Sequence, residues 1–428
     1  MTVPEAFGTA AHGAAVLAVV LLLAAAGRRA ARRLRQPEVV GEVTMGLVAA
    51  PLVLALAGRP ALDTLLPPSL VTHLSLLGQA ALVLFLVGAT HRLGPGVRPR
   101  SMSWVVAGSL VPPLCCGAAL VGVVALTGDR AARGDAPLPA FLLMAGVAMS
   151  ITAVPVLSRI LADRGMTGAP AGRVALASAV AIDSVGWVML SVALALRDGD
   201  GSGTLHALSG LAVCAGCGLA LRHGLRLRAV TALAGRRPRL AAVALGGVAL
   251  AVAAGSEHLG MTAVLGAAVV GLSVPGDDPA WARAVASVSR LGAAGTPLFF
   301  VVTGLDLAGE VLSAASWTLV AAAVLLGCAG KLAGGWAGAR LGGMNRADAR
   351  RVGALMNTRG LTELVVLQAG FSAGILPAPL VLAMLVMALV TTAMTGPLLD
   401  LADRARRRAE RPPPRPARGT PVTKGSLP

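Results

Sequence analysis

Long apolar runs, separated by short arginine-rich loops, recur through most of the 428-residue sequence. Hydrophobic residues make up 56% of the chain and charged residues 13%, whereas soluble globular domains are about 45–50% apolar. Runs of this length are typical of segments that cross a bilayer, where no water bonds the backbone and only helices or closed barrels survive. The sequence therefore predicts an all-α polytopic membrane protein.

The apolar runs predict about thirteen transmembrane helices, some shorter than the roughly 20 residues that an untilted helix needs. The first is expected to be a retained helix, because no basic segment precedes it as in a signal peptide. We expect residues 1–402 to form the membrane domain and residues 403–428 a disordered basic cytoplasmic tail. The predicted helices are 11–27, 39–57, 74–89, 104–126, 138–161, 174–196, 205–221, 240–254, 259–274, 285–305, 314–339, 352–371 and 376–401.

The formal net charge is +17, from 37 Lys and Arg against 20 Asp and Glu. In a soluble chain such an excess would suggest nucleic acid, but here the arginines gather in alternate loops. Because positive loops face the cytoplasm, we expect an extracellular N-terminus and a cytoplasmic C-terminus in the plasma membrane. The expected partner of the basic tail is anionic lipid, and no nucleic-acid partner is expected.

Two of the predicted helices contain an interruption. Residues 150–155 (SITAVP) include a proline that removes a backbone donor, and residues 356–360 (MNTRG) place polar groups and glycine inside an apolar run. Non-helical backbone at membrane depth is tolerated only where protein or a water-filled cavity satisfies it. Paired interruptions of this kind point to two structural repeats and to a transporter site near the bilayer midplane.

Asp183 lies near the centre of the apolar run 174–196. A charged Asp there costs roughly 2.5–3.5 kcal/mol on insertion scales, so it indicates a functional site; the alternative is a cap of a broken helix. Its carboxylate could bind a hard monovalent cation or a proton, and a site that holds either one suffices for antiport. The expected oxygen-bearing neighbours at the interruptions are Ser150, Thr152, Asn357 and Thr358.

Lys331 lies in the middle of a predicted membrane helix, and Lys424 is the only other lysine. Lysine, unlike arginine, can lose its proton when desolvated, so Lys331 is interpreted as a counter-ion or proton carrier, with a snorkelling side chain as the alternative. Arg359 and Glu363 are four residues apart and share a helix face. They are interpreted as a structural ion pair or as part of an ion site.

Six motifs occur in order along the chain: 34–42 (LRQPEVVGE), 84–88 (LFLVG), 150–161 (SITAVPVLSRIL), 266–272 (GAAVVGL), 297–300 (PLFF) and 356–364 (MNTRGLTEL). Together they resemble the monovalent cation:proton antiporters of the second group, which include bacterial Kef-type and Na+/H+ exchangers and plant cation/H+ exchangers. The resemblance covers nearly the whole predicted membrane domain.

This resemblance implies inverted repeats with two crossed discontinuous helices, and a core domain that moves beside a second, homodimer-forming domain. It implies exchange of Na+ or K+ for H+ at Asp183, with no cofactor and no other metal. Lys331 falls on the helix that bears the family's basic residue near this carboxylate. Thr152, Pro155 and residues 357–359 fall in the crossing.

Two positions depart from the family pattern. Ile182 precedes Asp183 where the family usually has Asn, Asp or Gln. The family's Glu after LFLVG is also missing, since Ala89 and Thr90 follow Gly88. A lone aspartate favours electroneutral exchange, and Ile182 leaves Lys331 either with another partner or partly deprotonated. The alternative function is a non-transporting membrane sensor or scaffold that keeps the antiporter fold. An enzyme is not expected, since the six histidines are scattered at helix ends and loops.

Overall fold

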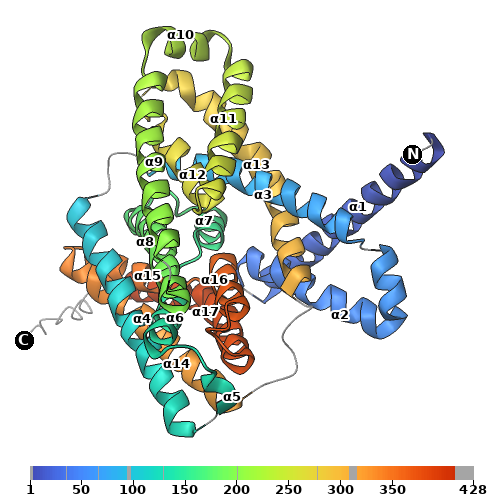
Figure 1. The fold of residues 1–428 in the computed structure, drawn as a ribbon. Coiled ribbons are helices and arrows are strands. Elements are labelled where there is room, and N and C mark those ends of the chain that lie inside the picture. The colour runs from blue at the N-terminus through green and yellow to red at the C-terminus, as the bar shows by residue number, and fades with distance from the viewer. Residues whose placement is uncertain are drawn as a thin grey trace, which may run out of the picture.

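The structure is a computed structural model that describes residues 3–34, 36–65, 67–93, 98–128, 130–199, 201–276, 278–307 and 316–409. Within these ranges it contains helices and no strand (Figure 1). The first half holds α1 (Val3–Arg33), α2 (Glu38–Leu65), α3 (Pro68–His91), α4 (Pro99–Thr127), α5 (Arg130–Arg133), α6 (Leu138–Ser150), α7 (Val154–Asp163), α8 (Pro170–Asp198) and α9 (Ser202–Leu225). The second half holds α10 (Arg228–Arg236), α11 (Pro238–His258), α12 (Ala263–Ser273), α13 (Pro279–Leu307), α14 (Trp317–Leu341), α15 (Arg346–Met356), α16 (Leu361–Ser372) and α17 (Ala378–Ala409).

The prediction of an all-α membrane protein is confirmed, but the count of thirteen spans is not. Helix occupies each predicted range, yet only 10 described segments are long and apolar enough to cross a membrane. The short helices α5 and α10, which lie in arginine-containing loops, were not predicted. Helix α17 continues to Ala409, beyond the predicted domain end at 402, and residues 410–428 of the predicted tail lie outside the described residues.

Local sequence explains where many of these helices begin and end. Proline stands in the first turn of α3, α4, α6, α7, α8 and α11, where its missing N–H has no helical partner to lose. Helices α4 and α8 end at Gly128 and Gly199, which adopt the left-handed conformation with φ of 65° and 75°. Local turn chemistry therefore fixes the ends of helices whose centres are uniformly apolar.

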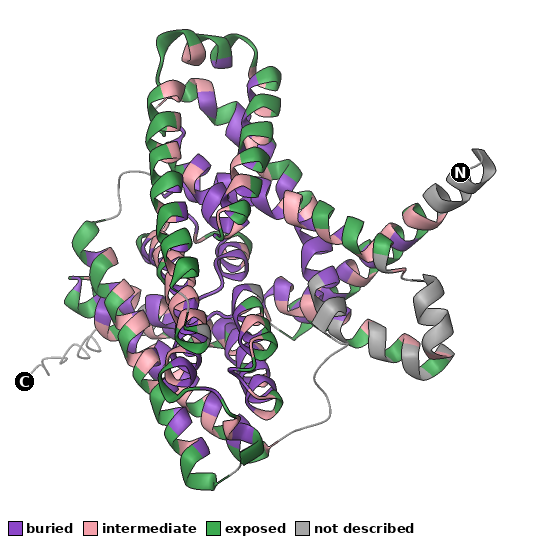
Figure 2. Ribbon diagram, viewed as in Figure 1, coloured by how far each residue is buried: buried purple, intermediate pink, exposed green. Residues whose placement is uncertain are grey.

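The helices pack in two groups. Helices α4, α6, α7, α8, α14, α15, α16 and α17 form the core bundle, in which α4 and α14 pack closely and both interrupted helices lie inside. Helices α1, α2, α3, α11, α12 and α13 form the scaffold bundle, and α9 contacts both α8 and α12 (Figure 1). Buried residues concentrate where the helices of each bundle face one another (Figure 2).

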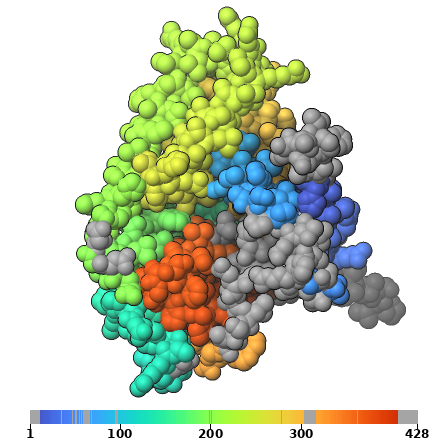
Figure 3. All heavy atoms as spheres, turned by 45° about the vertical axis from the view of Figure 1, so that its right-hand side comes forward, coloured from blue at the N-terminus to red at the C-terminus, as the bar shows by residue number. Residues whose placement is uncertain are grey.

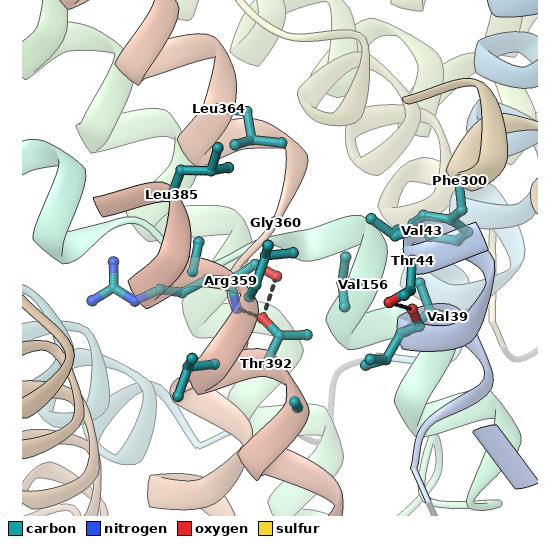
Figure 4. A pocket seen from close by; sticks show the side chains of 15 residues that line it. Val39, Val43, Thr44, Val156, Phe300, Arg359, Gly360, Leu364, Leu385 and Thr392 are labelled. Atoms are coloured by element: carbon teal, nitrogen blue, oxygen red, sulfur yellow. Dashed lines mark hydrogen bonds between the residues drawn. The ribbon is translucent and has the colours of Figure 1, made fainter. Parts of the chain in front are cut away.

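An apolar cavity of about 340 Å³ lies between the two bundles. Figure 4 shows Val43 and Phe300 of the scaffold bundle on one side and Leu364, Leu385 and Thr392 of the core bundle on the other. The surfaces of α16 and α17, in orange-red, lie near those of α3, in blue, in Figure 3. The bundles are thus separated here by a gap in the packing, which makes this boundary a natural plane for relative movement.

Glycines allow the close approach of α4 and α14. A Cβ at Gly334 would collide with the carbonyl oxygen of Gly108, and a Cβ at Gly338 would collide with that of Trp104. Backbone oxygens are not flexible side chains, so any larger residue would push the helices apart. This contact also fixes the position of Lys331, which lies one turn from Gly334 on α14.

Gly334→Ala is therefore expected to destabilise the protein by about 1–3 kcal/mol, the usual cost of overpacking. The matched control is Gly122→Ala on α4, where a Cβ would meet nothing within 4 Å. Thermal unfolding of the detergent-purified variants is the measurement, with a lower melting temperature expected for Gly334→Ala only. Equal melting temperatures for the two variants would contradict this account of the packing.

Candidate ion site at the helix crossing

The two interrupted helices cross inside the core bundle, as predicted. Helix α6 ends at Ser150 and α7 starts at Val154, while α15 ends at Met356 and α16 starts at Leu361. In the extended links, Ala153 N–H donates to the carbonyl oxygen of Thr358 at 3.2 Å. The Thr152 hydroxyl donates to the carbonyl of Met356 at 3.3 Å. Pro155 follows the break and lies in the first turn of α7, so it starts a helix there.

Lys331 binds the carbonyl end of α6. Its Nζ donates to the carbonyl oxygen of Ser109 at 3.1 Å, to the Thr152 hydroxyl at 2.7 Å and to the carbonyl of Ser150. The side chain is 0% exposed, so it does not snorkel to the surface. Lys331 thus has three oxygen partners although residue 182 is apolar. Its role as a proton carrier stays a prediction.

Arg359 supports the same helix end from another side. Its Nη1 donates to the carbonyl of Ala148 at 2.9 Å and its Nη2 to that of Met149 at 2.6 Å. Its Nη1 also pairs with Glu363 Oε1 at 3.2 Å, and both side chains are 0% exposed. The predicted ion pair is therefore present, and Arg359 joins it to the last turn of α6, where carbonyl groups lack helical partners.

Asp183 lies on α8 and is 2% exposed. Its Oδ2 accepts a hydrogen bond from the Thr262 hydroxyl at 3.0 Å, and its Oδ1 has no partner among the described residues. Thr262 is the N-cap of α12, where its Oγ1 also accepts from Leu265 N–H at 3.1 Å. The sequence indicates Thr262 only as a threonine before an apolar run, which predicts a helix start and not a contact with Asp183.

The four oxygen-bearing residues that the sequence places near Asp183 have other hydrogen-bond partners. Their observed bonds hold the crossing and its neighbours together, and a role as cation ligands stays a prediction. These bonds join Ser150 Oγ to Gly146 O at 2.7 Å, Thr152 to Lys331 and Met356, Asn357 Nδ2 to Thr391 O at 3.1 Å, and Thr358 Oγ1 to Thr395 Oγ1 at 3.4 Å.

Comparison with known proteins identifies the group to which this arrangement belongs. Residues 17–401 match the profile of the family described as the transmembrane sodium/hydrogen exchanger. The chain belongs to this family.

Among similar exchanger-family proteins, cation/H(+) antiporter 17 of Arabidopsis thaliana is 31% identical over 379 residues, covering 86% of this chain and 45% of the relative. The chain thus spans about half the length of this relative. The Na(+)/H(+) antiporter NhaS4 of Synechocystis is 29% identical over 377 residues, 86% of this chain and 91% of the relative. The structure of the sodium proton antiporter MjNhaP1 from Methanocaldococcus jannaschii matches with a TM-score of 0.57 at 14% identity, over 93% of this chain and 97% of that one, which shows a shared fold.

An ion pair also connects the two bundles of this exchanger-family chain, and a second one lies beside it within the scaffold bundle. Arg159 of α7 in the core bundle pairs with Glu38 of α2 in the scaffold bundle at 3.3 Å. Glu42, which is 0% exposed, pairs with Arg28 of α1 at 3.0 Å. The Arg159–Glu38 pair therefore joins the bundles in the observed arrangement, while the Arg28–Glu42 pair joins α1 to α2.

Arg359→Met is expected to cost about 3–5 kcal/mol, because it leaves Glu363 buried without its partner. A second substitution, Glu363→Met, should restore part of that stability by removing the unpaired carboxylate. The matched control is Arg164→Met, whose partner Asp400 is 39% exposed and whose loss should cost about 0–1 kcal/mol. Thermal unfolding in detergent measures the stability of these variants. Equal losses of stability for Arg359→Met and Arg164→Met would refute the role of Arg359 as the partner of a buried carboxylate.

Proposed function

We propose that this chain is a secondary antiporter that exchanges a monovalent cation, Na+ or K+, for H+ across the plasma membrane at Asp183. The carrying observation is the carboxylate itself, 2% exposed inside the bundle, with one oxygen unpartnered among the described residues. Family membership and the names of the relatives, which are cation/H+ and Na+/H+ antiporters, support the same reading.

The burial of Asp183 explains why its carboxylate would always bind either a cation or a proton. An isolated carboxylate is strongly disfavoured in a low-dielectric interior, and either a bound cation or a proton removes its net charge. The described residues give Asp183 a hydroxyl neighbour but no cationic partner. The unloaded, charged carboxylate is therefore the least favourable state for crossing between the two sides of the membrane.

Competition at this single carboxylate would couple the two ions. A high proton concentration protonates Asp183 and releases the cation, and a high cation concentration displaces the proton. Asp183 carries one negative charge, and each load carries one positive charge, so the loaded site is neutral in both cases. This equality supports electroneutral, one-for-one exchange.

Lys331 and Arg359 would serve as fixed charges at the crossing. Both donate to backbone carbonyls of α6, whose C-terminal end carries a partial negative charge. These contacts offset the partial negative charge at the end of α6. The two side chains are therefore not paired with Asp183, and its charge stays available to the transported ion. Lys331 therefore fits the role of a counter-ion to the helix end.

Alternating access would require the core bundle to move against the scaffold bundle. The gap between them and the few polar contacts that join them, Asp183–Thr262 and Arg159–Glu38, support this division. In this proposal the scaffold bundle forms the homodimer. The alternating arginine-rich loops support an extracellular N-terminus and a cytoplasmic C-terminus.

Asp183→Asn is expected to abolish cation-dependent proton movement in proteoliposomes that hold an imposed pH gradient, because the amide cannot bind a cation by charge or exchange a proton. Dye-reported proton movement on adding Na+, K+ or Li+ measures this. The matched control is Asp278→Asn, since Asp278 accepts from Ala280 N–H at 2.9 Å and Asn caps helices equally well.

Exchange in wild type and Asp278→Asn, with none in Asp183→Asn, would support the proposal and name the ion. Exchange that persists in Asp183→Asn would overturn the role of this carboxylate. A wild-type protein without response to any of the three cations would favour the alternative function, a non-transporting membrane sensor or scaffold protein.

A further inference from the structure

A second cavity, of about 160 Å³, lies where the two bundles meet, and its wall includes Thr262, the hydrogen-bond partner of Asp183. Scaffold helices α3 and α11 and the start of α12 contribute to its wall, together with α7, α8 and α16 of the core bundle. Its volume accommodates several water molecules. Its polar lining consists of Gln79, Trp187, Glu257, Thr262 and Thr362.

Several polar atoms at this cavity lack partners. The Thr362 hydroxyl, the Trp187 indole N–H and Asp183 Oδ1 are buried and have no hydrogen bond among the described residues. A buried polar group without a partner costs about 1–3 kcal/mol. Thr362 and Trp187 line the cavity, and Asp183 is bonded to Thr262, which also lines it. These unpartnered groups indicate that an occupant of the cavity supplies their missing interactions.

The chemistry of these groups selects the occupant. Hydroxyl and carboxylate oxygens are hard ligands that suit a hard cation. The indole N–H can only donate, so it suits a water molecule in the shell of that cation. The carboxylate of Glu257 on the wall also disfavours an anion. The cavity therefore fits a partly hydrated hard cation.

Thr262 is oriented for this role. Its Oγ1 donates to Asp183 Oδ2 at 3.0 Å and accepts from Leu265 N–H at 3.1 Å. A hydroxyl oxygen has two lone pairs, so one remains for a ligand after the bond from Leu265 is made. The N-cap bond holds this oxygen beside both the carboxylate and the cavity.

We propose that the hydroxyls of Thr262 and Thr362 are ligands of the transported cation together with Asp183. That the ion is a monovalent cation rests on the proposed function. The assignment adds two hydroxyls to the set expected from the sequence, of which Thr152 and Thr358 also make hydrogen bonds in the crossing. The site is thereby shared: Asp183 and Thr362 belong to the core bundle, and Thr262 belongs to the scaffold bundle.

Sharing the site between bundles gives a means of release. When the core bundle moves, Asp183 and Thr362 leave Thr262 behind, and the cation loses one oxygen ligand. A proton on Asp183 needs no second ligand of this kind. Movement would therefore weaken cation binding more than proton binding, and cation release would follow from the change in arrangement.

The test is cation-dependent thermal stabilisation of the purified full chain. Melting temperatures are measured against NaCl, KCl and LiCl, with choline chloride holding ionic strength constant. Thr262→Val and Thr362→Val keep the side-chain shape and remove the hydroxyl. Each should raise the half-saturating cation concentration about tenfold or more, the effect of losing one bond to a charged group. Thr262→Ser keeps the hydroxyl and should restore the wild-type value.

Two features separate ligand loss from structural damage. Thr262→Val also removes a helix cap, which lowers the melting temperature without cation, but the half-saturating concentration is read from the cation-dependent increment. Thr362→Val removes a hydroxyl that has no partner among the described residues, so its melting temperature without cation should stay at the wild-type value or above.

An unchanged half-saturating concentration in Thr262→Val or in Thr362→Val removes that residue from the ligand set. A wild-type protein that no cation stabilises overturns the site itself. Stabilisation that depends on both hydroxyls, in a protein that shows no exchange in proteoliposomes, supports this assignment and overturns the proposed antiport.

Discussion

The core bundle depends on two buried, positively charged side chains that bind the end of an interrupted helix. Helix α6 stops inside the protein, where its last carbonyls have no helical partners and no bulk water. Lys331 and Arg359 donate to three consecutive carbonyl oxygens there, at Ala148, Met149 and Ser150. Because both donors lie far along the chain, Lys331 on α14 and Arg359 in the link between α15 and α16, the break in α6 is stable only in the folded bundle.

This arrangement separates the polar groups into two sets. One set, which includes Thr152 and Arg359, fixes the crossing through short contacts with backbone atoms. The other set, which includes Asp183, Thr262 and Thr362, has buried oxygens with few or no partners. A rigid crossing thus lies beside a site with unused ligand capacity. Transport needs both: a frame that keeps its geometry and a site that can exchange its contents.

The sequence predicts the features that arise from local pattern. Apolar runs predict the helices, polar residues in two of them predict the interruptions, and the four-residue spacing predicts the pairing of Arg359 with Glu363. The partners of Lys331 and the contact between Asp183 and Thr262 are not predictable in this way. They join residues far apart in the chain, and their meeting depends on how α14 packs on α4 and α12 on α8. The oxygen-bearing residues expected near Asp183 illustrate the limit, because the sequence does not give the other hydrogen bonds that these residues make in the crossing.

Ile182 shows how a departure from the family pattern can be accommodated. Its side chain is 0% exposed and lies in an apolar cluster with Ala179 and Leu355. Neighbouring positions on a helix point about 100° apart, so Ile182 and Asp183 occupy different environments. A polar residue at 182 would be needed only if Lys331 lacked partners, and three oxygens already satisfy it. An apolar residue at 182 therefore packs in the bundle and adds no polar group immediately before Asp183 in the sequence. In the proposed mechanism Asp183 carries the transported charge, and the absence of a second carboxylate at 182 supports electroneutral exchange.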